Sequence, residues 1–200
     1  MFDHFDILAP IYDRAIPFSR LELMLRMVDL PVEGILLDAG GGTGRVANAL
    51  RPYVQQAYVV DFSRGMLAQA RDKGLMGLQS PAEQLPFSSG TFDRIIMVDA
   101  LHHVHQQSAT VTELWRVLKP GGRLVIEEPD VRTWQVKIVA VVEKLALMRS
   151  HFLAPPHIAD LFPTSANVKI NTEGYNAWVI AIKSSASPSP IKNSIITAGL

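Results

Sequence analysis

The sequence predicts an α/β fold in which a mostly parallel sheet is covered by helices on both faces. Short apolar, β-branched runs alternate with helical patterns along the chain, a rhythm typical of such sheets. A cluster of glycines follows the first of these runs, at the kind of strand-to-helix turn where such folds bind ligands. With 200 residues, of which 48% are hydrophobic, the chain is long enough to bury the core of one domain.

The apolar runs give the positions of the strands. We expect strands at residues 35–39, 57–61, 75–79, 92–98 and 123–127. The third run is the weakest of them, because it is the least apolar. A β-hairpin of residues 168–171 and 175–182, joined across Glu173 and Gly174, should close the sheet.

Helices are expected between these strands. The first follows the glycine cluster and runs through Leu50, and the second is capped by Ser63, runs to Lys73 and stops at Gly74. A third helix is indicated by apolar residues at the spacing i, i+3, i+4 and i+7. These residues are Val111, Leu114, Trp115 and Leu118.

The last part of the chain is less regular. The segment Lys119-Pro-Gly-Gly122 is predicted to end the third helix and to turn the chain into the strand at 123–127. A long helix is expected at 132–149, followed by a loop-rich segment at 151–163 that contains Pro155 and Pro156. The helix is apolar around most of its circumference, which favours core packing over contact with lipid.

Composition excludes several classes of protein. Lys and Arg together number 19, as do Asp and Glu, so the formal net charge of +0 gives no general attraction to nucleic acid. The absence of cysteine excludes disulfides, cysteine-bound zinc and a thiol nucleophile. The acidic start of the chain does not resemble a signal peptide, and no apolar run is long enough to cross a membrane. A cytoplasmic location is therefore expected.

The glycine cluster indicates a nucleoside ligand without phosphates. It reads Asp38-Ala-Gly-Gly-Gly-Thr-Gly44. A dinucleotide site needs a third glycine where this chain has Arg45, and a phosphate-binding loop needs a lysine that is absent. The negative charge of Asp38 would repel a pyrophosphate but could receive an ammonium group. A tight turn with a purely structural role is the alternative.

Asp61 stands at the end of the second expected strand. A carboxylate at this position can accept hydrogen bonds from both ribose hydroxyls of a nucleoside. The alternative is that Asp61 caps the next helix, but Ser63 is better placed to do so. We therefore expect Asp61 to bind a ribose.

A series of motifs then resembles class I S-adenosylmethionine-dependent methyltransferases. The chain is most similar to their small-molecule branch, which includes the ubiquinone/menaquinone C-methyltransferases. The motifs are Asp38 to Gly44, Val60 to Ser63 with Met66, Ala82 to Phe87, Phe92-Asp93 and Leu118 to Gly122. The resemblance implies a seven-stranded sheet of order 3-2-1-4-5-7-6 with an antiparallel seventh strand, S-adenosylmethionine as cofactor and S-adenosylhomocysteine as product.

The resemblance also implies a division of the chain. A single domain would cover residues 1–183, with an N-terminal cap and helix at 1–30 and a cofactor-binding core at 35–128. Residues 130–183 would form the wall on the acceptor side together with the closing hairpin. The Ser- and Pro-rich end, 184–200, is expected to be a flexible tail.

Site residues follow from the same resemblance. Asp38 would lie near the methionine ammonium, Asp61 would hold the ribose, and Val98 would lie beneath the sulfonium. The cofactor-binding residues implied are Asp38, Ala39, Gly40, Gly41, Gly42, Gly44, Asp61, Phe62, Met66, Ala82, Glu83 and Val98. Many relatives carry Asp where this chain has Pro81. Recognition of the adenine is then left to backbone groups or to Ser80, with Glu83 either a substitute or a solvated side chain.

On the acceptor side, His103 and Tyr12 are the candidate catalytic residues. His103 belongs to Leu101-His-His-Val-His105, which follows the fourth strand. Adjacent histidines should point apart, so at most one of this pair would face the cofactor, and packing is an equal alternative. Asp99, His151 and His157 are further candidates. No convergent set of metal ligands is found, and no metal is expected.

Methyl transfer to a small, aromatic or lipophilic acceptor by in-line displacement is the leading hypothesis for function. Alignment alone supplies much of the acceleration in such a reaction, so a general base is optional. An RNA or protein methyltransferase, or a catalytically silent S-adenosylmethionine-binding partner protein, stays open as an alternative. A nicotinamide oxidoreductase is disfavoured by the glycine spacing.

Overall fold

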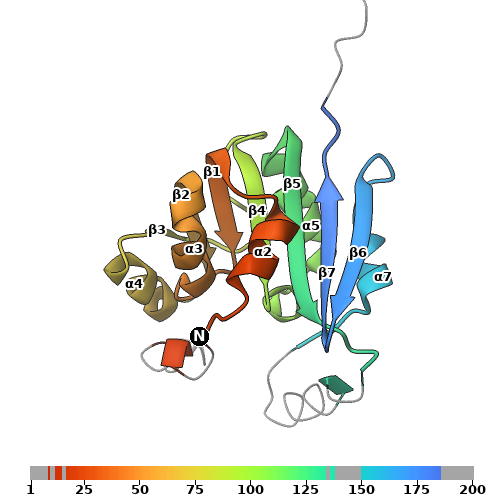
Figure 1. Cartoon of the computed structure of the whole chain (residues 1–200), viewed down its shortest axis with the longest axis horizontal. Coiled ribbons are helices and arrows are strands. Elements are labelled where there is room, and N and C mark those ends of the chain that lie inside the picture. Colours follow the sequence, from red (N-terminus) through yellow and green to blue (C-terminus); the bar gives the residue numbers. More distant parts are fainter. Residues whose placement is uncertain (1–8, 10–11, 15–16, 134–135, 138–149, 186–200) are drawn as a thin grey trace, which may run out of the picture.

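Figure 1 shows the computed structural model, which describes residues 9, 12–14, 17–133, 136–137 and 150–185. One seven-stranded sheet has the strand order β3-β2-β1-β4-β5-β7-β6. The first five strands pair in parallel, and β7 runs antiparallel to both β5 and β6. The strands are β1 (Val32–Ala39), β2 (Val54–Asp61), β3 (Met76–Gln79), β4 (Phe92–Val98), β5 (Leu118–Pro129), β6 (Asn167–Glu173) and β7 (Asn176–Ile182). The predicted order and the antiparallel last strand are confirmed.

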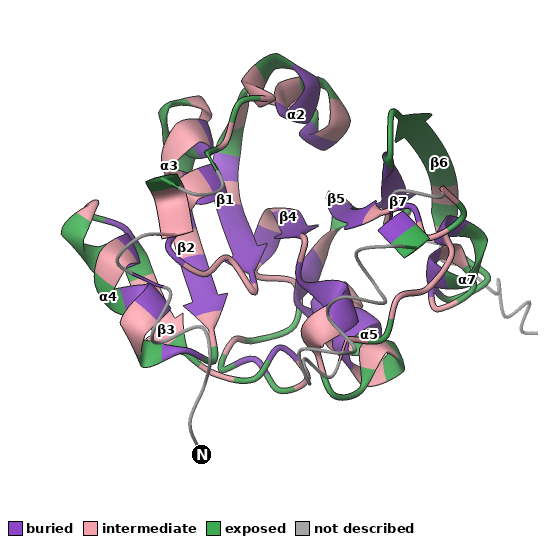
Figure 2. Ribbon diagram, turned by 90° about the horizontal axis from the view of Figure 1, so that it is seen from below, coloured by how far each residue is buried: buried purple, intermediate pink, exposed green. Residues whose placement is uncertain are grey.

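Helices cover both faces of this sheet, as Figure 2 shows from the edge where the parallel strands end. The helices α2 and α3 lie over one face, and α5 and α7 lie over the other. The described α-helices are α2 (Leu21–Val28), α3 (Arg45–Leu50), α4 (Arg64–Asp72), α5 (Gln107–Val117) and α7 (Pro155–Ala159). Two short 3-10 helices, η1 (Arg51–Tyr53) and η2 (Leu101–His103), follow α3 and β4.

The alternation of side chains along the strands divides the core into two halves. In β1, Leu36 packs with α2, α3 and α4, whereas the next residue, Leu37, packs in the cluster that contains α5 and α7. The same alternation separates Val125 from Ile126 in β5. All four side chains are fully buried. Because both faces of the sheet are buried, the edges formed by the ends of its strands are the places open to a ligand.

Two expectations for local structure are wrong. Lys119-Pro-Gly-Gly122 lies inside β5 and is not a turn before it, because Gly121 adopts a φ of +80° and a register shift lets Leu118 pair with Phe92. Pro155 and Pro156 do not lie in a loop but begin α7. Proline is tolerated in the first turn of a helix, where its missing N–H has no partner to lose.

The helix expected at 132–149 and the N-terminal cap fall mostly outside the described residues. Within that helix, Val136 and Lys137 are helical, and Lys137 N donates to Thr133 O at 3.2 Å. The tail beyond residue 185 is likewise not described. Among the described residues, no helix has the length and apolar character needed to span a bilayer.

Candidate functional site

The glycine turn joins β1 to α3 at the carboxyl edge of the sheet. Gly40 N and Gly41 N donate to Val60 O of β2 at 2.7 and 3.2 Å, which fastens the turn between the two strands. Gly40, Gly42 and Gly44 adopt positive φ angles of 66°, 56° and 70°. Other residues adopt this backbone only with strain, so the cluster of glycines is required by the shape of the turn.

Two glycines of this turn have different surroundings. A Cβ added at Gly44 would overlap the buried side chain of Leu75 and lie 3.2 Å from Ala70 Cβ, so Gly44 permits close packing of the turn. A Cβ added at Gly42 would meet nothing nearer than Met66 Sδ at 3.8 Å. The space over Gly42 is therefore open to a ligand.

Two backbone N–H groups hold the carboxylate of Asp61 in place beside this open space. Its Oδ2 accepts a hydrogen bond from Gly42 N and its Oδ1 accepts one from Ser63 N, both at 2.8 Å. The carboxylate thus connects the glycine turn to the start of α4, where Ser63 Oγ accepts from Met66 N. The neighbouring Phe62 ring is 64% exposed, which leaves an uncovered aromatic face next to an oriented carboxylate.

Asp38 supplies a buried negative group beneath the same turn. Its Oδ2 accepts from Ala47 N at 3.2 Å, while its Oδ1 has no hydrogen-bond partner among the described residues. Burial raises the pKa of this carboxyl to about 7, against the lowering effects of Ala47 N–H and Arg45. An unpaired carboxylate oxygen of this kind suits a cationic group such as an ammonium.

The remaining predicted cofactor residues lie at the ends of strands or in the loop that follows β3. Ala39 and Val98 end β1 and β4 and are both buried, and Ala82 is buried after β3. Glu83 is not a solvated side chain: its Oε1 accepts from His105 N and Gln106 N at 3.0 and 3.1 Å, just before α5. Ser80 Oγ donates to Gln84 O at 2.6 Å.

Tyr12, Arg45 and Asp99 come together near the carboxyl ends of β1 and β4. Arg45 Nη2 lies 3.4 Å from Asp99 Oδ2, and its guanidinium is 6.0 Å from the centre of the Tyr12 ring. Burial raises the pKa of Tyr12; Arg45 opposes this effect, whereas Asp99 and Asp61 add to it. Tyr12 therefore lies within electrostatic reach of both Asp61 and Asp99.

Asp13 holds this N-terminal segment to the glycine turn. Its carboxylate accepts a hydrogen bond from Thr43 Oγ1 and forms an ion pair with Lys73 Nζ at 2.8 Å. Lys73 Nζ also donates to Thr43 O at 2.9 Å. The sequence analysis missed Lys73 and Arg45 because their partners lie far away in the chain.

The side chains of His102 and His103 do not point apart as expected. The rings of His102 and His103 lie against each other with centroids 3.9 Å apart, because the tight 3-10 turn brings them together. His102 Nδ1 pairs with Glu128, whose other oxygen accepts from Ala100 N and Leu101 N at 3.0 and 2.7 Å. Burial, and then His102, lower the pKa of His103 to about 3, so its imidazole is neutral at pH 7.

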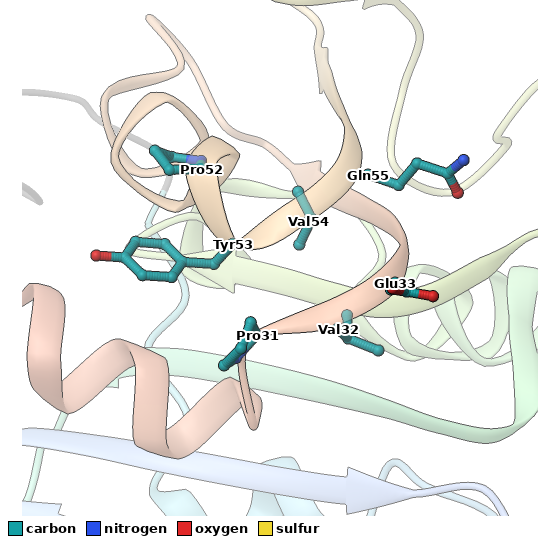
Figure 3. Close-up of a pocket in the computed structure, with 7 residues that line it drawn as sticks. All are labelled: Pro31, Val32, Glu33, Pro52, Tyr53, Val54 and Gln55. Carbon is teal, nitrogen blue, oxygen red and sulfur yellow. The ribbon is translucent and has the colours of Figure 1, made fainter.

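One hollow of the described residues is not part of this site. It has a volume of about 670 Å³ and lies at the amino ends of β1 and β2, at the opposite edge of the sheet (Figure 3). It is lined by Pro31, Val32, Glu33, Pro52, Tyr53, Val54 and Gln55. A smaller hollow of about 230 Å³ lies between Arg20 and the β6–β7 turn, at the carboxyl edge. No group of three or more described His, Asp or Glu side chains is arranged for a metal ion.

Comparisons with known proteins agree with this geometry. Residues 37–126 match the family described as a methyltransferase domain. An uncharacterized methyltransferase of Bacillus subtilis, YcgJ, is 36% identical over 113 residues, which cover 53% of this chain and 45% of that protein. The ubiquinone/menaquinone biosynthesis C-methyltransferase UbiE of Geotalea daltonii is 33% identical over 142 residues, 62% of this chain and 60% of that protein. The chain thus spans about half the length of the curated relatives that it matches.

Solved structures show the same fold. One of them is described as an S-adenosylmethionine-dependent methyltransferase, possibly a histamine N-methyltransferase, from Thermotoga maritima. It superposes with a TM-score of 0.75 at 23% identity and covers 90% of this chain and 98% of that one. At this level of identity the match establishes the architecture.

Proposed function

We propose that the chain carries a class I S-adenosylmethionine-dependent methyltransferase domain and transfers a methyl group from this cofactor to a small aromatic or lipophilic acceptor; the match of residues 37–126 to the methyltransferase domain family supports this. The observation that carries the proposal is the arrangement at the glycine turn. An unpaired oxygen of buried Asp38, open space over Gly42 and a braced carboxylate at Asp61 lie together at one edge of the sheet.

The residues present fit the cofactor. Asp38 would receive its ammonium group, Asp61 would accept from its ribose hydroxyls, and Phe62 with Met66 would pack on its adenine. When bound, S-adenosylmethionine supplies a methyl group made electrophilic by the sulfonium. The chain itself would position the reactants: Thr43 and Lys73 hold Asp13, and the neighbouring Tyr12, whose ring lies near Arg45, would help to exclude water.

The acceptor is proposed from charge and from the relatives. The formal net charge of +0 gives the protein no general electrostatic attraction to the phosphates of RNA. One relative is named a C-methyltransferase of ubiquinone/menaquinone biosynthesis, which favours a quinone-type ring as the acceptor. A ring of that kind suits a site next to Tyr12 and the His102–Phe152 stack, whose ring centroids are 4.3 Å apart.

A tracer experiment tests this proposal. Purified protein is incubated with S-adenosylmethionine carrying a tritiated methyl group, together with demethylmenaquinol, a total lipid extract, total RNA or a mixed protein fraction. We expect the label in the quinol or lipid arm. Label in the RNA or protein arm would replace the proposed acceptor class, and cofactor binding with no label in any arm would indicate a silent binding protein. The Asp61→Ala variant serves as the control for cofactor dependence.

A further inference from the structure

Asp99 occupies a strained position at the carboxyl end of β4. It directly follows Val98, and its backbone has a φ of +51°, in the left-handed region that disfavours residues other than glycine. Its N–H donates to Glu127 O at 2.9 Å, which fixes the residue against the end of β5. Such a backbone is unfavourable for most residues other than glycine and is typically retained where a side chain is needed in place.

The side chain of Asp99 differs from the other acids at this edge. Glu128 is buried and accepts from two backbone N–H groups and His102. Glu127 is also buried, binds Arg20 and accepts from Asn176 Nδ2 at 2.9 Å. Asp99 keeps 29% of its side chain exposed and meets Arg45 only at 3.4 Å. It is therefore the acid of this group that a ligand can reach.

Charged and titratable side chains from several elements surround Asp99. Burial and, after it, Glu128 raise the pKa of Asp99, while the cations nearby lower it. These charged and titratable neighbours are Glu128 and Glu127 of β5, Arg45 of α3, His102 of η2, Arg20 before α2, and Tyr12. A carboxylate that holds a proton more readily than usual is a stronger base than an ordinary aspartate.

We propose that Asp99 is the residue that accepts the proton lost by the methyl acceptor. This inference rests on the proposed function and adds a catalytic residue to it. In the step, a bond forms between the acceptor atom and the methyl carbon, the carbon–sulfur bond breaks with its electron pair left on sulfur, and the acceptor proton passes to a carboxylate oxygen of Asp99. The exposed part of the side chain lets this proton pass on to water.

The alternative proton acceptor on this side of the sheet is less suited. His103 Nδ1 lies 3.3 Å from Ser150 Oγ, and its ring is packed against His102. Its pKa of about 3 makes the neutral imidazole a weak base at pH 7. The geometry therefore favours Asp99, and Arg45 is placed to stabilise its carboxylate once the proton has left.

The Asp99→Asn variant tests the role, since it keeps the shape and tolerates the same backbone but cannot accept a proton. We expect single-turnover transfer to demethylmenaquinol to fall by about a hundredfold or more, while S-adenosylhomocysteine affinity by calorimetry stays within about twofold. The matched control is Asp160→Asn, an exposed acid at the end of α7, which should retain the normal rate. Unchanged transfer in Asp99→Asn overturns the inference. Absence of transfer by the unaltered protein would instead contradict the proposed acceptor.

A second readout does not depend on activity. Because the pKa of Asp99 is raised in the folded protein, the unaltered chain should lose stability relative to Asp99→Asn as the pH rises above about 4, the ordinary pKa of an aspartate. Thermal unfolding of both proteins across this range measures the difference. A difference that does not vary with pH would contradict the inference. If Asp99→Asn does not fold, Asp99→Gly, which removes both strain and carboxylate, replaces it in both measurements.

Discussion

At the scale of single residues, we propose that the buried carboxyl of Asp38 makes ligand binding depend on pH. Its pKa of about 7 in the folded protein, raised by burial from 3.8, means that the site holds a proton below neutral pH. That proton must leave before the carboxylate can pair with an ammonium group. The same shift lowers the stability of the unliganded protein as pH rises from about 4 to 7.

We therefore predict that S-adenosylhomocysteine binds more tightly as pH increases, by up to about tenfold per unit below pH 7, and levels off above it. Calorimetric titrations between pH 5.5 and 8.5 would measure this. Asp38→Asn should bind weakly and without this slope. An equal affinity for the unaltered protein at all these pH values would show that Asp38 does not meet the ammonium.

A second residue prediction concerns Asp61. Replacing it with alanine should weaken S-adenosylhomocysteine binding by about ten- to a hundredfold, corresponding to about 1.5–3 kcal/mol for hydrogen bonds to a charged group. The change also frees Gly42 N and Ser63 N, so unfolding should cost about 1 kcal/mol less. Calorimetry and thermal unfolding test the two parts. Full affinity in Asp61→Ala would mean that the ribose is held elsewhere.

The residues of the site differ in how far sequence could identify them. Asp38 and Asp61 stand beside glycines and strand ends that are visible as local patterns. The contacts of Arg45 with Asp99 and Tyr12 join segments far apart in the chain, and nothing local to Arg45 indicates them. Glu83 shows the same limit, because its partners at the start of α5 are set by the packing of two loops.

At the scale of elements, the glycine turn contains one glycine needed for close packing, Gly44, and one, Gly42, that leaves space for the proposed ligand. Gly44→Ala should destabilise the protein by about 3 kcal/mol, since strain at a positive φ adds to overlap with buried Leu75. Gly42→Val should lower stability less but remove cofactor binding, because its side chain fills open space. Thermal unfolding and calorimetry of the two variants measure this contrast. A stable Gly44→Ala, or a Gly42→Val that still binds, would contradict it.

Elements with strong local signals matched their predictions. Ser63 and Gly74 mark the two ends of α4, and the short apolar run at 92–98 predicted the bounds of β4. The extent of β5 was not predictable in this way. By their local sequence Gly121 and Gly122 indicate a turn, and only their pairing partner shows that they belong to a strand. Gly121 N and Gly122 O bond to Lys183 after β7, and this long-range contact overrides the local preference.

At the scale of the whole molecule, the N-terminal segment connects to the site through Asp13 and Tyr12. Deleting residues 1–17 removes the hydrogen bond of Asp13 to Thr43, its ion pair with Lys73, and the Tyr12 ring near Arg45. We predict that methyl transfer is abolished while S-adenosylhomocysteine affinity falls at most about tenfold. A truncated protein with full transfer activity would contradict the capping role. Circular dichroism and thermal unfolding establish that the variant is folded.

The topology of the whole sheet was predictable only with the family resemblance. Periodicity alone indicated a mostly parallel sheet, whereas the crossover that places β7 between β5 and β6 depends on pairings that no local pattern shows. The same holds for the histidine pair, whose orientation follows from the 3-10 turn and from Glu128 on the neighbouring strand.

The measurement that tests the central claim most directly is a calorimetric titration of the unaltered protein with S-adenosylhomocysteine and, in parallel, with NADH. The account predicts binding of S-adenosylhomocysteine at one site per chain and no measurable binding of NADH. The reason is that Asp38 opposes a pyrophosphate and Arg45 replaces the third glycine of a dinucleotide turn. Binding of NADH with equal or higher affinity, or no binding of S-adenosylhomocysteine, would contradict it.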